Sequence, residues 1–167
     1  YECPVMVVDW LKEQLLDTAE VEGWISIAAY HHLYVYRNQR HTLNQAITTY
    51  HALRRAEDHI EANRIALSSI VEPLMKSGHY IDLINDWLPL ICQSEDAKTR
   101  GEAFEQSGKS LFHIADYKNA FSYFEQSLAI YRQIGDQASE NRIINQLSII
   151  YRIRGDYGTA LSYLEKL

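Results

Sequence analysis

Residues 116–125, DYKNAFSYFE, are closely copied 40 residues further along the chain by residues 156–165, DYGTALSYLE. The two stretches share Asp, Tyr, Ala, Ser, Tyr and Glu at equivalent positions and keep apolar residues at two others. An internal period of this length is typical of stacked helical hairpins. Because each hairpin buries its apolar face only against its neighbours, such a stack leaves a long groove exposed.

Length and charge limit the classes of partner. The chain has 167 residues, of which 47% are hydrophobic, and this is enough for one domain of ordinary size. Its 16 Lys and Arg against 22 Asp and Glu give a formal net charge of −6. An acidic chain without a basic stripe is poorly suited to nucleic acid or to an anionic membrane, so we expect neither as a partner.

The two cysteines and the chain ends suggest a cytoplasmic fragment. Cys3 and Cys92 have no metal-type spacing, so we expect free thiols in a reducing cytosol. No apolar run approaches the roughly 18 residues that span a bilayer. The chain starts at Tyr1 without Met and stops at Leu167 inside an apparent helix, which we interpret as a piece of a longer protein.

Helix start and stop signals mark the hairpins. Gly155 stands where a helix would end in a left-handed residue, and Asp156 is placed to cap the next helix. One repeat earlier Asp116 again caps, but Ala115 replaces the glycine. A left-handed Ala is costly, so we expect a tighter or differently shaped turn there.

The same signals predict helices along the whole chain and no strand. The predicted helices cover residues 6–20, 24–38, 42–56, 59–77, 79–92, 97–114, 117–133, 138–154 and 157–167. Their connections are short and polar, so consecutive helices should be antiparallel neighbours in one continuous domain. The expected fold is all-α.

Small residues at matching places in the two repeats suggest where paired helices cross. Gly108 with Ala120, and Ser148 with Ala160, would allow two helices to approach at the short end of the usual interaxial range. Apolar and aromatic fillers surround them: Phe104, Leu111, Tyr117, Phe124, Ile144, Leu147, Tyr151, Tyr157 and Leu164. In these features residues 97–167 resemble the tetratricopeptide family. The resemblance implies a right-handed superhelix of antiparallel helix pairs, with two repeats in this region and the last one truncated.

The match weakens toward the N-terminus. Over residues 59–96 it is degenerate, because Val71 and Leu83 are too bulky for the same close crossing. Pro73 and Pro89 fall inside apparent helices, where each removes a hydrogen bond and should bend the rod. We therefore treat residues 1–96 as a degenerate helical-repeat region that departs from regular superhelical geometry.

A second resemblance concerns the first half of the chain. Trp24 followed by residues 28–33, AAYHHL, and residues 49–54, TYHALR, look like the helical region that follows the nucleotide-binding core in signal-transduction NTPases. In that class the downstream repeats act as a sensor and autoinhibitory arm. The chain contains no glycine-rich phosphate loop, so such a core would lie outside it.

No residue pattern suggests an enzyme active site, a metal centre or a cofactor. His31 and His32 are adjacent on a helix and point about 100° apart, which is poor geometry for one metal ion. His51 and His59 are better explained as surface or capping residues. The pair Ser68 and Ser69 has no third partner at the spacing of a catalytic triad. We therefore expect a noncatalytic protein.

Tyrosine is abundant, with twelve residues against four Phe. Most of them fall on or beside repeat-defining positions, where an aromatic body packs and its polar tip reaches the rim. Tyr30, Tyr34 and Tyr36 lie in the irregular first half instead. They could form an aromatic surface for a partner helix or for another domain of the parent chain.

The family resemblance places a binding groove on the first helix of each pair. Carried onto this chain, the groove would be lined by Glu102, Glu105, Lys109, Phe112, His113, Arg142, Asn145, Ile149, Arg152 and Ile153. We take seven as candidate peptide- or partner-binding residues: Glu105, Lys109, Phe112, Arg142, Asn145, Ile149 and Arg152. Lys109, Asn145 and Arg152 could hold an acidic peptide by charge-assisted hydrogen bonds. Glu105 occupies a key place of the family's carboxylate clamp, which argues against that particular mode.

These observations favour an interaction scaffold that binds a protein or peptide through its groove. The alternatives are a sensor or autoinhibitory arm of a signal-transduction NTPase, or part of a transcription regulator whose DNA-binding domain would precede Tyr1. The final hairpin would leave Tyr151, Leu161 and Leu164 without a next repeat, so a dimer through this exposed end is also expected.

Overall fold

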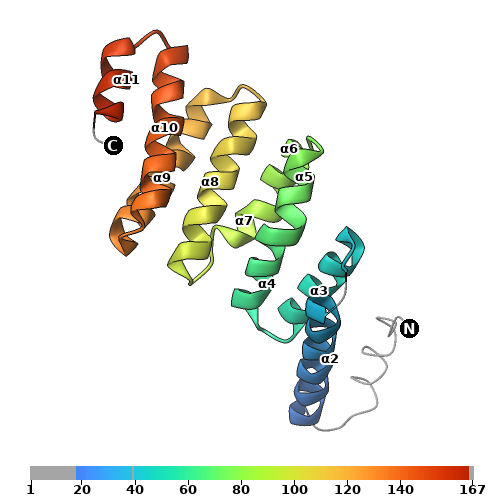
Figure 1. Cartoon of the computed structure of the whole chain (residues 1–167). Coiled ribbons are helices and arrows are strands. Elements are labelled where there is room, and N and C mark those ends of the chain that lie inside the picture. Colours follow the sequence, from blue (N-terminus) through green and yellow to red (C-terminus); the bar gives the residue numbers. More distant parts are fainter. Residues whose placement is uncertain (1–17, 39, 166–167) are drawn as a thin grey trace. The chain divides into compact units, whose positions relative to one another are not determined.

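The structure is a computed structural model that describes residues 18–38 and 40–165. Every regular element in this part of the chain is helical, and no strand occurs in it (Figure 1). The expected all-α class is therefore confirmed. The chain divides between Ala66 and Leu67 into two compact units. The right-handed superhelix, and the regions 1–96 and 97–167 as parts of one continuous domain, stay predictions.

The first unit contains α2 (Thr18–Asn38), α3 (Leu43–Arg55) and α4 (His59–Ala66). Thr42 starts α3 with a capping box, in which its hydroxyl accepts from the backbone N–H of Gln45 and the Gln45 side chain accepts from the backbone N–H of Thr42. Arg37 on α2 forms an ion pair with Glu61 on α4 at 2.6 Å. These contacts join the three helices around a small apolar core that includes Ala29, Leu33, Ala46, Leu53 and Ala62.

One predicted boundary in this unit is wrong. We expected a break between residues 20 and 24, but α2 runs through them without interruption. Gly23 disfavours a helix by only about 1 kcal/mol relative to Ala, which the rest of a 21-residue helix can offset. The predicted helix over residues 6–20 lies mostly outside the described residues.

The second unit begins with two pieces of helix that each contain a π-helical turn. The first piece is η1 (Leu67–Val71) followed by α5 (Glu72–Lys76). The second is α6 (Tyr80–Asp82), η2 (Leu83–Trp87) and α7 (Leu88–Ile91). Each π turn ends just before a proline at the start of the next α-helix, Pro73 or Pro89. A wider turn accommodates the missing N–H and the ring of proline, so the predicted irregularity of this region has a visible cause.

Two regular helix pairs follow. They are α8 (Ala97–His113) with α9 (Tyr117–Ile134), and α10 (Gln137–Ile153) with α11 (Tyr157–Leu164). Ser127 in the C-terminal half of α9 donates to the backbone oxygen of Gly101 at 2.9 Å, while Phe112 and Tyr117 are in ring contact at 5.3 Å at the other end. The two helices are therefore antiparallel, as the short connections predicted.

The crossing of α8 and α9 depends on Gly108. A Cβ atom built on Gly108 would lie 2.7 Å from two ring atoms of Phe124, which is closer than real Cβ contacts occur. Ala120, the partner expected from the sequence, is fully buried in the same core cluster as Phe124, but the atoms nearest to the added Cβ belong to Phe124. One cluster forms the core of this region: Leu111, Ala120, Phe124, Leu128, Tyr131, Ile143, Ile144, Leu147 and Ile150.

In the part of the chain that the structure describes, five turns between helices share one geometry. A residue with φ between 60° and 81° ends the preceding helix, and the N–H groups of this residue and of the next one donate to carbonyl groups in the last turn. The five residues are Glu57, Gly78, Ala115, Gly135 and Gly155. The expectation of a differently shaped turn at Ala115 is therefore wrong: its φ is 64°, and Asp116 donates to Leu111 O at 2.9 Å as Asp156 does to Tyr151 O at 3.0 Å.

Candidate functional site

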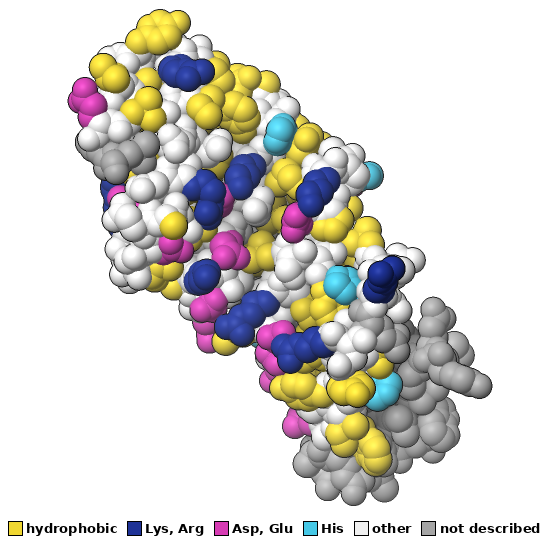
Figure 2. All heavy atoms as spheres, viewed as in Figure 1, with side chains coloured by type: hydrophobic (Ala, Val, Ile, Leu, Met, Phe, Trp, Pro, Cys, Tyr) yellow, Lys and Arg dark blue, Asp and Glu magenta, His cyan; other side chains and the backbone are white. Residues whose placement is uncertain are grey.

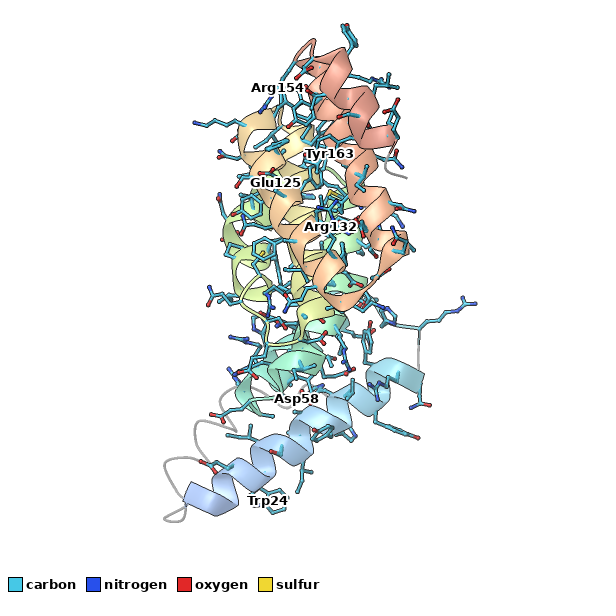
Figure 3. The ribbon with its side chains drawn as sticks, turned by 90° about the vertical axis from the view of Figure 1, so that its left-hand side faces the viewer. Trp24, Asp58, Glu125, Arg132, Arg154 and Tyr163 are labelled. Carbon is cyan, nitrogen blue, oxygen red and sulfur yellow. The ribbon has the colours of Figure 1, made fainter. Side chains whose placement is uncertain are left out.

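The candidate residues lie on α8 and α10, which run in the same direction because each is antiparallel to α9. Arg132 and Glu140 form an ion pair of 2.7 Å next to the α9–α10 turn, and Phe121 touches Tyr151 at the far end of the pair. Arg132 is labelled in Figure 3. We call the surface formed by Glu105, Lys109, Phe112, Arg142, Asn145, Ile149 and Arg152 the α8/α10 face. Figure 2 shows Lys and Arg side chains mixed with Asp and Glu over the region of these helices.

A buried carboxylate is at the centre of this face. The side chain of Glu105 is only 3% exposed. Its Oε1 accepts from Lys109 Nζ at 2.7 Å and from Arg142 Nε at 2.7 Å. Its Oε2 accepts from Arg142 Nη2 at 2.8 Å and from the Tyr131 hydroxyl at 3.0 Å. Glu105 thus joins three helices, α8, α9 and α10, through charge-assisted hydrogen bonds.

The pKa shifts in this cluster follow from its geometry. Burial alone would raise the pKa of Glu105, but the hydrogen bonds and charges of Arg142 and Lys109 outweigh it and hold the pKa below its ordinary value. The hydrogen bonds that Arg142 donates to Glu105 raise the pKa of Arg142. Burial, followed by the charge of Glu105, raises the pKa of Tyr131. At neutral pH Glu105 is therefore a carboxylate, Arg142 is a cation and Tyr131 is a neutral phenol.

Glu102 lies one turn before Glu105 and behaves differently. It is partly buried, and burial is the main reason that its pKa is raised; the charge of Glu105 adds to this, while Lys98 and Arg142 act in the opposite direction. Among the described residues, no hydrogen bond or ion pair is recorded for its side chain. This carboxylate is therefore held near the cations without being paired to them.

The apolar candidates are partly buried. Phe112 packs against the core cluster and contacts Tyr117, and Ile149 is also of intermediate exposure. The neighbouring His113 is exposed and stacks on Tyr80 of α6, with ring centroids 4.6 Å apart and planes inclined by 6°. These side chains provide apolar and aromatic surface beside the charged cluster.

Asn145 and Arg152 are both exposed on α10. Neither side chain has a recorded hydrogen bond or ion pair within the described part of the chain. By helical spacing they share a face with Arg142. Their polar groups are available to a ligand, whereas the ammonium of Lys109 already shares its charge with Glu105.

The sequence anticipated only part of this arrangement. It placed Glu105, Lys109 and Arg142 on one surface but treated them as ligand contacts, and it missed that they bind one another. The Glu105–Lys109 contact has the four-residue spacing of a helical ion pair and could have been found. Tyr131 was missed altogether. Its signal was weak, because only the general need of a buried tyrosine hydroxyl for a partner pointed to it.

Other candidate residues fall outside this face. The rings of His31 and His32 are 6.3 Å apart, and the described residues contain no group of three or more His, Cys, Asp or Glu that could hold a metal ion. Cys92 is a free thiol whose pKa is raised by burial. Cys3 lies outside the described residues. No helix in the described part of the chain is long and apolar enough to cross a membrane.

Three aromatic residues of α2 are largely exposed. Trp24, Tyr30 and Tyr34 on α2 have exposed fractions of 57%, 54% and 67%. Trp24 is labelled near the N-terminal end of α2 in Figure 3. The Tyr30 hydroxyl donates to Asp58 at 3.2 Å, and Tyr36 is only partly exposed and stacks on His41.

Antiparallel helix pairs with caps, left-handed turns and a glycine at the crossing define the second half of the chain as a helical-repeat protein. A comparison with protein families gives the particular class: residues 99–167 match the model described as tetratricopeptide repeat. This segment is a tetratricopeptide-repeat region, as its residues suggested. Such repeats generally mediate protein–protein interaction and generally serve as noncatalytic scaffolds. A search of curated proteins found no match to the chain.

Proposed function

We propose that the α8/α10 face binds a peptide segment of a partner protein that carries an acidic group beside an apolar side chain. The observation that carries this proposal is that the exposed polar groups of Asn145 and Arg152, which have no recorded partner within the described residues, accompany the partly buried Ile149 and Phe112 on this face. An apolar patch with a few polar groups around it suits a peptide that is anchored by one side chain and oriented by hydrogen bonds.

The charge of the face supports an acidic ligand. Lys109, Arg142 and Arg152 provide three cations, and Glu102 and Glu105 provide two carboxylates, so this surface has an excess of positive charge on a chain whose formal net charge is −6. A local potential that is opposite to that of the whole molecule favours one orientation of an acidic partner during encounter.

A displayed peptide library selected on the chain would provide ligands for a test. We expect the selected peptides to be enriched in Asp or Glu near an apolar residue. Ile149→Glu places a carboxylate on the α8/α10 face and should abolish their binding. Ala129→Glu adds the same charge at an exposed position of α9 and serves as the matched control. The proposal would be refuted by selected peptides that bind the Ile149→Glu variant as tightly as the parent chain, or that lose affinity only for the Ala129→Glu control.

A second candidate concerns the parent protein. Exposed Trp24, Tyr30 and Tyr34 support the hypothesis that the first unit docks on another domain, as the sensor arm of a signal-transduction NTPase would. A phosphate loop encoded upstream of Tyr1 would favour this hypothesis, and a DNA-binding helical domain there would favour the transcription regulator. Cytoplasmic location and a dimer through the exposed C-terminal end likewise stay predictions.

A further inference from the structure

We propose that Lys109 and Arg142 form an anion subsite within the α8/α10 face, that Glu105 positions both cations, and that the subsite takes a carboxylate side chain of the bound segment. This inference rests on the proposed function and names where on the face the acidic group binds. It differs from the sequence-based expectation, which relied on Lys109, Asn145 and Arg152.

One carboxylate oxygen of Glu105 brings Lys109 and Arg142 together. Lys109 Nζ and Arg142 Nε each lie 2.7 Å from Glu105 Oε1. Without the carboxylate, two cations at this separation would repel one another strongly. When Glu105 is present, the positive charges of Lys109 and Arg142 share its single negative charge. These three side chains together keep an excess of one positive charge, which a carboxylate of the ligand would neutralise.

Arg142 and Lys109 both retain N–H donors that Glu105 does not use. Arg142 uses Nε and Nη2 for Glu105 and also donates from Nη2 to the Ser139 hydroxyl at 3.1 Å. No partner is recorded for its Nη1 within the described residues. Lys109 has three N–H groups and one recorded acceptor, Glu105. The Arg142 and Lys109 side chains are 47% and 29% exposed, so an incoming carboxylate can reach these donors from solvent.

The subsite is preorganised before a ligand binds. Glu105 is held in place by burial and by the Tyr131 hydroxyl, and in turn it fixes two long side chains that would otherwise lose rotamer freedom on binding. Ordering such side chains before the ligand arrives removes part of the entropic cost of association. A surface lysine and arginine without this support would bind a carboxylate more weakly.

Glu102 opposes the anion. Its unpaired carboxylate lies within electrostatic range of Arg142 and Glu105, together with Lys98 and the helix-capping Asp96. Asp136 also lies within electrostatic range of Arg142, and its carboxylate accepts hydrogen bonds from the N–H and the hydroxyl of Ser139. Replacing Glu102 by Gln therefore removes repulsion while keeping the size of the side chain, and should strengthen anion binding.

The probes for a test are tetraglutamate and tetraglutamine, each acetylated at its N-terminus and amidated at its C-terminus, so that the two peptides differ only in their side-chain carboxylates. We expect tetraglutamate, but not tetraglutamine, to shift the Arg142 Nε–Hε resonance in a titration followed by NMR. Lys109→Met keeps the aliphatic stem, leaves Glu105 bonded to Arg142 and Tyr131, and should weaken tetraglutamate binding about tenfold. Glu102→Gln should tighten it.

Lys118→Gln is the matched control, because it removes an exposed cation of α9 that lies outside the α8/α10 face and has no recorded hydrogen bond or ion pair within the described residues. We expect its affinity for tetraglutamate to stay within about twofold of the parent chain, since it lies outside the subsite. A loss in Lys118→Gln as large as that in Lys109→Met would overturn the subsite and leave the proposed function standing. Failure of the parent chain to bind tetraglutamate would also overturn it, whereas the proposed function is decided by the library peptides and Ile149→Glu. A persisting Arg142 Nε–Hε resonance in Lys109→Met would verify that this variant is folded.

Discussion

Gly108 shows how a single residue sets the distance between two helices. Its missing Cβ leaves room for the ring of Phe124, which is fully buried between α8 and α9. The same glycine is a poor choice for a helix interior, where it is about 1 kcal/mol less favourable than Ala. Helix propensity and packing therefore favour different residues at this position, and the tight contact explains why glycine occupies it.

The residue-scale prediction is that Gly108→Ala destabilises the chain. Forcing a methyl group into the Phe124 ring should cost more than the gain in helix propensity, with a net loss of about 1–2 kcal/mol. Unfolding in urea, followed by circular dichroism, would measure it. The control is Gly158→Ala in the first turn of α11, where the nearest atom to a new Cβ is 3.9 Å away. That variant should be neutral or slightly stabilised; a loss as large as that of Gly108→Ala would contradict the packing argument.

The sequence predicted a close helix crossing at Gly108, but it did not predict that the ring of Phe124 fills the space left by the missing Cβ. The repeat offset identifies small residues, because they recur. Which ring occupies the space depends on side-chain rotamers and on the rotation of both helices, which are decided by the whole core. The same holds for Glu105 and Arg142, since they are 37 residues apart and no local pattern connects them.

The elements are joined by turns whose geometry is more regular than their sequence. Glycine occupies the left-handed position at residues 78, 135 and 155, but Ala115 and Glu57 adopt the same conformation. We expected the local cost of a left-handed Ala to change the turn. Instead, the following cap and the packing of both helices impose it: Asp116 accepts from the backbone N–H of Asn119 at 3.2 Å, as Asp136 does from Ser139 at 3.1 Å.

The element-scale prediction follows from this strain. Ala115→Gly should stabilise the chain by about 0.5–1 kcal/mol, because relief of the left-handed conformation exceeds the entropy that glycine adds to the unfolded state. Gly135→Ala, the reciprocal change in the next turn, should destabilise it by a similar amount. Thermal melting of both variants would measure the effects. A destabilised Ala115→Gly variant would show that the methyl group of Ala115 makes a contact worth more than the strain.

The π-helical turns before Pro73 and Pro89 were only partly predictable. Each proline predicts a lost hydrogen bond, and from this we expected irregular geometry. It does not predict how the backbone responds, since a kink, a helix end and a π turn all accommodate the ring. The bending of the rod itself stays a prediction.

For the whole molecule, ionisation links stability to pH. The carboxylates of Asp116, Asp136 and Asp156 accept backbone and side-chain hydrogen bonds that hold their pKa values below the ordinary 3.8. The pKa of Glu105 is also held below its ordinary 4.5, despite its burial. Groups with lowered folded-state pKa values contribute stability above their unfolded pKa, and this contribution is lost as the pH falls through the folded value. Glu102, with its raised pKa, acts in the opposite direction.

The prediction at this scale is a urea midpoint that decreases below about pH 4, because five carboxylates with lowered pKa values, including that of Glu72, outweigh Glu102, whose pKa is raised. Burial lowers the pKa values of His32 and His51, and these two groups add a decrease that begins as the pH falls below about 6.5. Asn caps helices about as well as Asp but does not titrate there. The triple variant Asp116→Asn, Asp136→Asn, Asp156→Asn should therefore be folded at neutral pH and show a shallower acid decrease, with Glu105 as the main remaining contributor. An unchanged pH profile in the triple variant would rule out the caps as its source.

The overall architecture was the most predictable level. Repeat offset, caps and turn residues together placed the starts of the helices of the second half, and every end but the last, to within about one residue, because every signal there is local. The helix predicted over residues 157–167 ends earlier, at Leu164. The boundary between the units after Ala66 was not anticipated, since it falls where helical conformation continues from α4 into η1 and no linker composition marks it. The binding role of the α8/α10 face stays a prediction.

The carboxylate of Glu105 also determines where this array can be shortened. It comes from one helix hairpin, and the guanidinium that neutralises it belongs to the next. A truncated chain that ended after Gly135 would retain every residue of the α8–α9 pair, yet it would deprive the Glu105 carboxylate of its two hydrogen bonds from Arg142 and leave only Lys109 and the Tyr131 phenol beside it. Engineers who wish to excise or transplant this hairpin would need to carry Arg142 along, or replace Glu105 by a neutral residue at the same time.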